Sequence, residues 1–507
     1  MGHCGFTIYD MIARNAGLFA EKCALVHGGR RLSFEGYRRL CDRAAEMLLK
    51  EGVEKGERIA LLSENSDDYL IICGGAARTG SVVVPLNYRL GEEELEYIIR
   101  DSGAKRIFTG DNYGETSKRL AALPGIELKS LNLTAAAREE ATGVSDAPEK
   151  RGEGSCDNGP GADDAFMIIY TAAVGGHPRG CVLSHSNLLA VAFQLNHLLK
   201  LSGDDCHVVT LPLFHIGGFP MTLAVMQQGG KNVLLDRFDP LRVLEEVEKE
   251  EGTFFGTFPP MLAAILDVQD KHSIKAPSLR GVGGVDAPDT VQRFLKNNPH
   301  AVFYSLYGQT EAMPVSGGDS REKPGSVGLP GIMTRVVIMD DSDRQVPAGV
   351  SGEICVRSPS VFMEYWNLKS ETLRTFRNGW HHTGDLGRLD DEGVLWYEGR
   401  KPEKELIKPG GENVYPAEVE QVILSQGSID EVCVIGVPDS EWGEAVKAVC
   451  VCGEGRVITE DEITSFVASK IARYKKPKYV VFVDSMPKNP EGGIDREAVK
   501  KTHGDVK

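Results

Sequence analysis

The sequence lacks several features that would place it in a simple class of protein. No apolar run approaches the ~18 residues that span a bilayer, so we expect a soluble chain. Its eleven cysteines include no Cys-x-x-Cys pair, and no secretory leader precedes them. They predict reduced thiols in a cytoplasmic protein rather than a disulfide framework or a zinc site.

An excess of basic residues is also missing. Asp and Glu number 73 against 57 Lys and Arg, which gives a formal net charge of −16. Because nucleic-acid binding needs a basic face that neutralises phosphates, we expect no nucleic-acid partner. A polyanionic ligand would have to be bound locally, by loops and a metal ion. The sequence leaves open whether identical chains assemble into a homo-oligomer.

What is present favours a large folded enzyme or binding protein. A chain of 507 residues suits one large compound domain plus a smaller one. Near the N-terminus, Ser33 caps a helical pattern, and strand-like runs at 58–62 and 82–86 flank a helix at 67–79. This alternation predicts an α/β fold in which helices cover the sheets.

A break in composition near residue 400 predicts a domain boundary. The basic, glycine-rich segment GRKPEKELIKPGGENVYP leads into a short α/β module. In that module Pro416 opens a helix, a strand follows at 431–437, a capping box at 459–462 starts another helix, and a strand occupies 479–483. We expect an N-terminal domain at 1–403, a mobile C-terminal domain at 404–507, and a hinge within 400–408.

The first candidate for chemistry is a glycine-rich loop. An apolar strand at 165–170 runs into Thr171-Ala-Ala-Val-Gly-Gly-His-Pro-Arg-Gly180. Thr171 and the backbone N–H groups of Gly175, Gly176 and Gly180 can cradle phosphate oxygens, and Arg179 adds a positive charge. The Walker A pattern is absent, and a glycine-rich turn alone is as often a plain loop. Its assignment therefore depends on other segments.

Four such segments follow in a defined order: Tyr304-Ser-Leu-Tyr-Gly-Gln-Thr-Glu311, Trp380-His-His-Thr-Gly-Asp-Leu386, Glu398-Gly-Arg400, and Lys404-Glu-Leu-Ile-Lys408 followed by Gly410-Gly-Glu-Asn-Val-Tyr-Pro416. Together with the glycine-rich loop they resemble the adenylate-forming superfamily of acyl-CoA synthetases, luciferases and peptide-synthetase adenylation domains. The resemblance covers nearly the whole chain and is closest to acyl-CoA or aryl-CoA ligases. The resemblance implies that the N-terminal domain binds the nucleotide and the acid.

The resemblance implies roles for individual residues. Thr310 would hydrogen-bond a phosphate, Glu311 would bind Mg²⁺, and Asp385 would accept the ribose hydroxyls beside Arg400. Tyr307 would offer its ring to adenine. The other residues given to ATP are Gly284, Val285, Asp286, Gly308 and Gln309.

A two-step reaction is implied as well. The acid's carboxylate attacks the α-phosphorus of ATP and forms an acyl-AMP, after which the small domain rotates and the thiol of CoA attacks the acyl carbon. Lys404 would be the pivot, although the spacing from Arg400 is about two residues longer than usual. Lys408, Gly410 and Gly411 would face CoA.

Two segments depart from the family pattern. In the glycine-rich loop, Ala172, Ala173 and Val174 replace hydroxyl or glycine positions, which predicts weaker ATP binding unless backbone donors and Mg²⁺ dominate. In Pro487-Lys-Asn-Pro-Glu-Gly-Gly-Ile-Asp-Arg496, Gly493 takes the place of the lysine that neutralises charge during adenylation. Loss of such a group commonly costs ~10²-fold in the step it serves, so Gly493 predicts impaired adenylation.

The Gly493 position has two explanations. It is either a change made to silence adenylation, which the loss at a single position favours, or a natural variant that works chiefly on the second half-reaction.

The acid is expected to bind near Leu211-Pro-Leu-Phe-His-Ile-Gly-Gly218. His215 is a candidate gate, although a lone histidine in an apolar run is more often a packed residue. No basic residue is identifiable there as a partner for a second charged group, so we expect a hydrophobic monocarboxylate of the aryl, alicyclic or medium-chain type. The residues predicted to contact it are Phe214, His215, Gly217, Gly283 and Gly308.

Two alternatives remain beside a CoA ligase that uses ATP and Mg²⁺. One is a stand-alone adenylation protein that passes its acyl group to a carrier thiol or an amine. The other is a non-catalytic binder of ATP or acyl-AMP. Tests of the acceptor, and of turnover after Gly493→Lys, distinguish these three.

Overall fold

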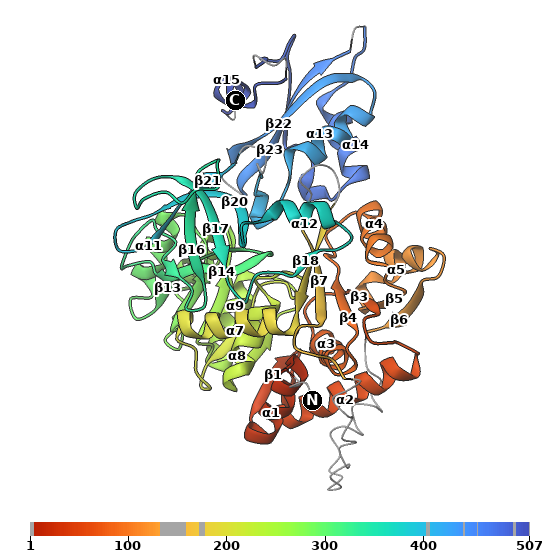
Figure 1. Cartoon of the computed structure of the whole chain (residues 1–507), viewed down its shortest axis with the longest axis vertical. Helices are drawn as coiled ribbons and strands as arrows, with labels where there is room; N and C mark the ends of the chain where they lie inside the picture. The colour runs from red at the N-terminus through yellow and green to blue at the C-terminus, as the bar shows by residue number, and fades with distance from the viewer. Residues whose placement is uncertain are drawn as a thin grey trace.

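The chain folds into a large N-terminal body and a small C-terminal one (Figure 1). The computed structural model describes residues 5–131, 159–171, 178–401, 406–439, 442–453, 455–489 and 493–505. Three of its sheets belong to the large body and one three-stranded sheet to the small body. The predicted α/β architecture, with a large compound domain and a small C-terminal domain, is confirmed. Within the described ranges, no helix has the length and apolarity needed to cross a membrane.

The first sheet of the large body has nine strands. Its central strands are parallel, and antiparallel strands close its two edges. In order across the sheet they are β15 (Leu329–Pro330), β14 (Ala312–Asp319), β13 (Val302–Gln309), β12 (Gly281–Gly284), β11 (Phe254–Thr257), β9 (Cys206–Val209), β10 (Lys231–Leu234), β1 (Cys23–His27) and β2 (Arg30–Ser33).

The second sheet has seven strands and carries the two strands that flank the glycine-rich loop. In order they are β18 (Glu364–Tyr365), β8 (Arg179–Ser184), β7 (Ala165–Thr171), β4 (Val82–Pro85), β3 (Arg58–Leu62), β5 (Arg106–Thr109) and β6 (Glu127–Ser130). Thr171 pairs with Arg179 across β7 and β8, so the loop leaves and re-enters the sheet at adjacent positions.

The third sheet is antiparallel and has five strands. These are β16 (Arg335–Met339), β17 (Gly352–Arg357), β20 (Trp380–Leu389) and β19 (Phe376–Arg377), with β21 (Leu395–Arg400) pairing with β20. The small domain has a fourth sheet, made of β22 (Ile429–Asp439), β23 (Gly443–Cys452) and β24 (Tyr479–Phe482).

Helices fill the space between the first two sheets and cover their outer faces. The largest apolar core joins both sheets through helices α1 (Ile8–Phe19), α2 (Phe34–Lys50), α3 (Asp67–Thr79), α7 (His185–Leu199) and α8 (Phe219–Gln228). A second core packs α9 (Pro240–Glu250), α10 (Met261–His272) and α11 (Pro288–Asn297) on the first sheet. A third packs α4 (Glu92–Ser102) and α5 (Gly114–Ala121) on the second sheet. Because both sheets are buried on two faces, ligands have access at the strand ends.

Four further α-helices lie among the described residues. Helix α12 (Lys369–Thr375) lies between β18 and β19 in the chain. In the small domain, α13 (Pro416–Ser425) and α14 (Glu460–Lys470) pack on the sheet, and α15 (Arg496–His503) ends the described chain. The apolar core of this domain begins at Ile407.

The local sequence signals correspond to the elements that form. Ser33 accepts a hydrogen bond from the Gly36 N–H at the start of α2, and Thr459 makes a capping box with Glu462 at the start of α14. Pro416 is the first residue of α13, as its fixed φ favours. The strand predicted at 82–86 ends one residue earlier, at Pro85.

Candidate active site

A cavity of about 280 Å³ opens at the strand ends of the first sheet, beside the small domain. Its wall combines residues that are far apart in the sequence. Those predicted from the sequence to bind ATP, the acid or CoA and found on this wall are Thr171, Arg179, His215, Gly217, Gly283, Gly284, Val285, Tyr307, Gly308, Gln309, Thr310, Glu311, Asp385, Arg400, Lys408 and Gly411.

Thr310 and Glu311 form the two-residue turn of the hairpin between β13 and β14. The hairpin holds both side chains at the cavity wall. Oε1 of Glu311 accepts a hydrogen bond of 2.7 Å from the Tyr365 hydroxyl, which fixes the carboxylate. Carboxylate and hydroxyl oxygens are ligands that a hard cation takes, so this turn fits Mg²⁺.

Asp385 and Arg400 face each other because β20 and β21 pair in antiparallel register at these two positions. The Arg400 Nε lies 3.2 Å from Oδ1 of Asp385. Burial would lower the pKa of Arg400, but the Asp385 carboxylate together with Tyr415 and Tyr397 raises it. Oδ2 of Asp385 accepts 2.7 Å and 3.4 Å hydrogen bonds from the Tyr307 hydroxyl and the Gln309 Nε2.

The turn after β12 supplies backbone rather than charge to the wall. A Cβ at Gly284 would lie 2.0 Å from the Thr257 carbonyl oxygen, so only glycine fits there. Val285 is exposed on the wall, whereas Asp286 does not line it. Burial raises the pKa of Asp286 to about 6. The predicted contact of Asp286 with ATP stays a prediction.

Only the two ends of the glycine-rich loop can be described. Thr171 and Arg179 lie on the wall, and Arg179 is 3.4 Å from the Glu371 carboxylate. Gly180 lies behind the wall, where an added Cβ would meet Ile168 at 2.7 Å. Gly175 and Gly176, like the three departures at Ala172, Ala173 and Val174, lie outside the described residues.

The part of the cavity where the acid is expected to bind is apolar. Its wall carries Leu211, Ile216, Met221, Phe258 and Met313 together with His215 and Gly217.

His215 is fixed and neutral at this end. Its Nδ1 accepts a 3.2 Å hydrogen bond from the Gly217 N–H, and its ring lies 5.9 Å from that of Phe258. Burial lowers the pKa of His215, so the imidazole is neutral. Phe214 does not line the cavity; its ring packs against Tyr88 at 5.3 Å.

The small domain closes the cavity with residues of one segment. Lys408, Gly411, Asn413 and Tyr415 lie on the wall. The Lys408 side chain is accessible from the cavity, but protein atoms surround it closely. Its pKa is lowered, first because the ammonium is poorly hydrated and second because of the positive charge of Arg400. Gly410 instead packs on Trp442, whose Cε3 would lie 2.6 Å from an added Cβ.

Gly493 is not among the wall residues, and Lys404 lies outside the described residues. The exposed Gly493 accepts a 2.8 Å hydrogen bond from the Asn489 N–H, and its own N–H donates to the Asn489 side-chain oxygen Oδ1 at 2.8 Å. Lys488 forms an ion pair with Glu431.

A buried ion-pair cluster joins the two domains. The ammonium of Lys475, which is 1% exposed, binds Glu94 at the start of α4 and Glu418 in α13, the latter at 2.7 Å. Burial would lower the pKa of Lys475, but both carboxylates raise it. Arg89 and Glu412 form a second contact between the domains.

Sequence reasoning missed several wall residues. Asn413 and Tyr415 belong to the quoted segment GGENVYP, which was a signal that could have found them. Thr383 likewise belongs to the quoted segment Trp380 to Leu386. Tyr365 and Tyr397 come from two different strands, and no local pattern marks them.

Comparisons with known proteins agree with this geometry. The family model described as AMP-binding enzyme matches residues 12–366, and the model of the AMP-binding enzyme C-terminal domain matches residues 418–492. A feruloyl-CoA synthase from an Amycolatopsis species is 34% identical over 97% of this chain and 98% of its own. An indoleacetate–CoA ligase from Aromatoleum aromaticum is 32% identical over 97% of each chain.

Among solved structures, o-succinylbenzoate CoA synthetase from Bacillus subtilis is similar in two complexes. Both share 26% identity with this chain and cover 97% of each chain. The TM-score is 0.85 for a double mutant bound to a CoA product analogue and 0.69 for the complex with the acyl-adenylate intermediate.

The chain therefore belongs to the AMP-binding enzyme family, within the adenylate-forming superfamily. More specifically, it is an AMP-forming acid–CoA ligase, an enzyme class that uses ATP and CoA.

Proposed function

We propose that this ligase activates a hydrophobic monocarboxylic acid as an acyl-AMP and transfers the acyl group to CoA. The observation that carries the proposal is the single cavity on which residues for the nucleotide, the acid and CoA meet. When all three substrates are held on one wall, each reaction step becomes effectively unimolecular, because the reacting groups are already in position.

The charges on the wall support this substrate class. The charged side chains of the described wall are Arg179, Glu311, Asp385, Arg400 and Lys408. Each of them has a proposed role toward ATP, Mg²⁺ or CoA, so none remains as a partner for an amino group or a second carboxylate. The relatives named for ferulate and indoleacetate favour an aromatic acid within the class.

In the proposed first step, residues of the large domain hold ATP. Asp385 accepts the ribose hydroxyls while the Tyr307 and Gln309 hydrogen bonds fix its carboxylate. Thr310 donates to a phosphate, and Glu311 binds Mg²⁺, which would neutralise phosphate charge. Gly493 offers no charge for the acid's carboxylate or the α-phosphate, so we expect this step to be slow.

In the proposed second step, the small domain is arranged for attack by the thiol. Lys408 and Gly411 face the cavity, whereas Gly493 does not. The higher similarity to the complex with a CoA product analogue supports the same arrangement. The second candidate, transfer to a carrier thiol or an amine, would use the same cavity and a different acceptor.

The proposal is tested by mass spectrometry of acyl-AMP and acyl-CoA, after a panel of acids is incubated with ATP, Mg²⁺ and CoA. Wild type, Gly493→Lys and Gly493→Ala are compared, the alanine variant being the control without charge. We expect acyl-CoA to form from aryl or medium-chain acids. We expect Gly493→Lys to form much more acyl-AMP than wild type, and Gly493→Ala to form no more than wild type. Turnover only with a carrier protein or an amine would favour the second candidate, and no product with any variant would favour a non-catalytic binder.

A further inference from the structure

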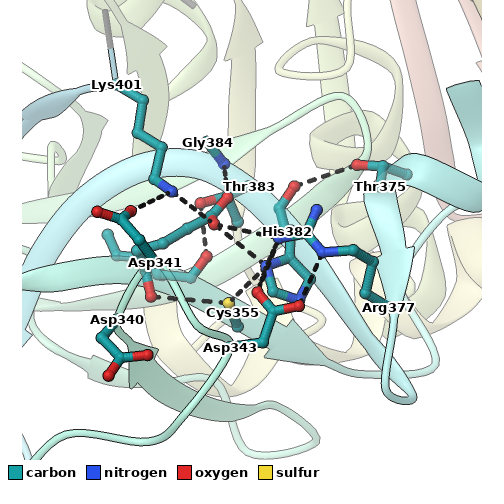
Figure 2. Close-up of polar contacts among 12 residues, drawn as sticks. Asp340, Asp341, Asp343, Cys355, Thr375, Arg377, His382, Thr383, Gly384 and Lys401 are labelled. Atoms are coloured by element: carbon teal, nitrogen blue, oxygen red, sulfur yellow. Dashed lines mark hydrogen bonds and ion pairs between the residues drawn. The ribbon is translucent and has the colours of Figure 1, made fainter.

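A closed ring of hydrogen bonds lies directly behind Asp385 and Arg400. Glu353 in β17 accepts the Gly384 N–H at 2.9 Å through Oε1, and the Lys401 N–H donates to the Gly384 carbonyl at 2.9 Å. The Lys401 ammonium then returns to Oε2 of Glu353 at 3.1 Å. Figure 2 shows Lys401 and Gly384 converging on this network.

Two members of the ring, Gly384 and Lys401, are sequence neighbours of Asp385 and Arg400. Gly384 precedes Asp385, and Lys401 follows Arg400. Gly384 has a φ of 70°, a left-handed conformation that favours glycine and turns the chain at this point. Because β20 and β21 are antiparallel, Gly384 and Lys401 lie next to each other on one side of the Asp385–Arg400 pair. Glu353 therefore fixes the backbone of both strands beside that pair through a single carboxylate.

The Glu353 carboxylate is buried and charged. Glu353 is 5% exposed, and burial alone would raise the pKa of its carboxyl group. The hydrogen bond with His382 and the charge of Lys401 reverse this effect and lower the pKa to about 2. A buried charge of this kind is retained only with good partners, because leaving one unpaired is costly.

A metal site is the other use that these residues suggest. Among the described residues, Glu353, Cys355 and His382 offer ligand atoms within 4.8 Å of one another. However, Lys401 contacts Glu353, and an Arg377 nitrogen lies 2.8 Å from Nδ1 of His382 (Figure 2). Burial and then Glu353 raise the pKa of the Cys355 thiol, which opposes the thiolate that a metal needs. The contacts favour a network of ion pairs.

From this ring we infer that Glu353 is a positioning residue for nucleotide binding, acting through Gly384 and Lys401 on the Asp385–Arg400 pair. The inference rests on the proposed ribose role of Asp385. Glu353 itself does not line the cavity. Its charge holds the end of β21 against Gly384, the residue that precedes Asp385.

Lys401 also provides a matched control. Its ammonium contacts Asp341 at 3.2 Å on the other side, and that carboxylate is 98% exposed (Figure 2). Asp341→Asn thus removes one negative partner of Lys401 without changing Gly384, whereas Glu353→Gln removes the buried partner and keeps the side-chain volume. An exposed pair contributes little, so the two variants should differ.

The experiment measures, by calorimetry, the dissociation constants of AMP and of 2′,3′-dideoxy-AMP for wild type, Glu353→Gln, Asp341→Asn and Asp385→Asn. For Glu353→Gln we expect AMP binding to weaken about tenfold, the loss of one hydrogen bond to a charged group, and dideoxy-AMP binding to stay unchanged. Asp341→Asn should bind both as wild type does. Glu353→Gln added to Asp385→Asn should cause no further loss.

The outcomes distinguish the ribose role of Asp385 from the positioning role of Glu353. Unchanged AMP binding in Asp385→Asn would remove the ribose assignment and, with it, this inference. Weakened binding in Asp385→Asn with normal binding in Glu353→Gln would overturn the inference alone, as would equal losses for AMP and dideoxy-AMP. One zinc ion per purified chain would also overturn it. If Glu353→Gln does not fold, Lys401→Met is measured in its place, with the same expectations.

Discussion

The Tyr307 hydroxyl donates a 2.7 Å hydrogen bond to Asp385. One strand residue thereby links the ring proposed for adenine to the carboxylate proposed for ribose. Tyr307→Phe keeps the ring and removes this bond, so we expect the KM for ATP to rise about tenfold with a smaller change in kcat. Steady-state kinetics with varied ATP measure this.

The control for Tyr307→Phe is Tyr304→Phe, because Tyr304 lies on the same strand but does not line the cavity. An equal rise in KM in both variants would contradict a specific role for the Tyr307 hydroxyl.

The contact between the domains through Glu94 predicts a selective kinetic effect. Glu94→Gln weakens the link to Lys475 but leaves the Lys475–Glu418 pair within the small domain. Because this link stabilises the arrangement in which Lys408 faces the cavity, we expect acyl-CoA formation from supplied acyl-AMP to slow about tenfold. Rapid quenching of single turnovers measures the rate.

Glu93→Gln is the matched control, because the Glu93–Lys470 pair also joins the domains but both side chains are largely exposed. A wild-type rate in Glu94→Gln, or the same loss in both variants, would contradict the assigned role of the buried pair.

Two glycines should respond differently to alanine. A Cβ at Gly284 would lie 2.0 Å from a backbone oxygen, whereas a Cβ at Gly493 would first meet a side-chain atom of Asn489 at 3.2 Å. We expect Gly284→Ala to lower the free energy of unfolding by about 1–3 kcal/mol and Gly493→Ala by much less. Urea unfolding followed by circular dichroism tests both, and similar losses would contradict the steric argument.

Buried His207 predicts how stability depends on pH. Burial lowers its pKa to about 4 from an unfolded value of about 6.5. A lowered folded pKa means that its stability contribution is complete above pH 6.5 and is lost as the pH falls toward 4. From pH 7 to pH 5 this loss amounts to about 2 kcal/mol.

In His207→Gln, which does not titrate, the fall in unfolding free energy over this range should be smaller by that amount. Urea unfolding at several pH values provides the comparison. Identical pH dependence in the two proteins would contradict the neutral state of His207.

The local elements and the family could be predicted from the sequence because their signals are local. Ser33, Thr459 and Pro416 mark helix starts by backbone chemistry that needs no distant partner. Motifs such as Thr310-Glu311 indicated the residues of the candidate site, because each motif keeps its residues on one strand or turn.

The remaining features depend on distances between separate strands. Nothing near Glu353 in the sequence indicates that its carboxylate would meet Gly384 and Lys401, and Lys475 finds Glu94 only after the domains pack. Phe214 belongs to a motif that reaches the cavity, but its own side chain packs on Tyr88. Such outcomes follow from tertiary packing, which periodicity and spacing do not encode.

The central claim is that the carboxylate of the acid attacks the α-phosphorus of ATP. The most direct test uses an aromatic acid labelled with ¹⁸O in both carboxylate oxygens, with Gly493→Lys, ATP, Mg²⁺ and CoA, and mass spectrometry of the nucleotide products. The account predicts AMP that carries one ¹⁸O atom, together with unlabelled pyrophosphate. Unlabelled AMP, or label in inorganic phosphate released with ADP, would contradict it.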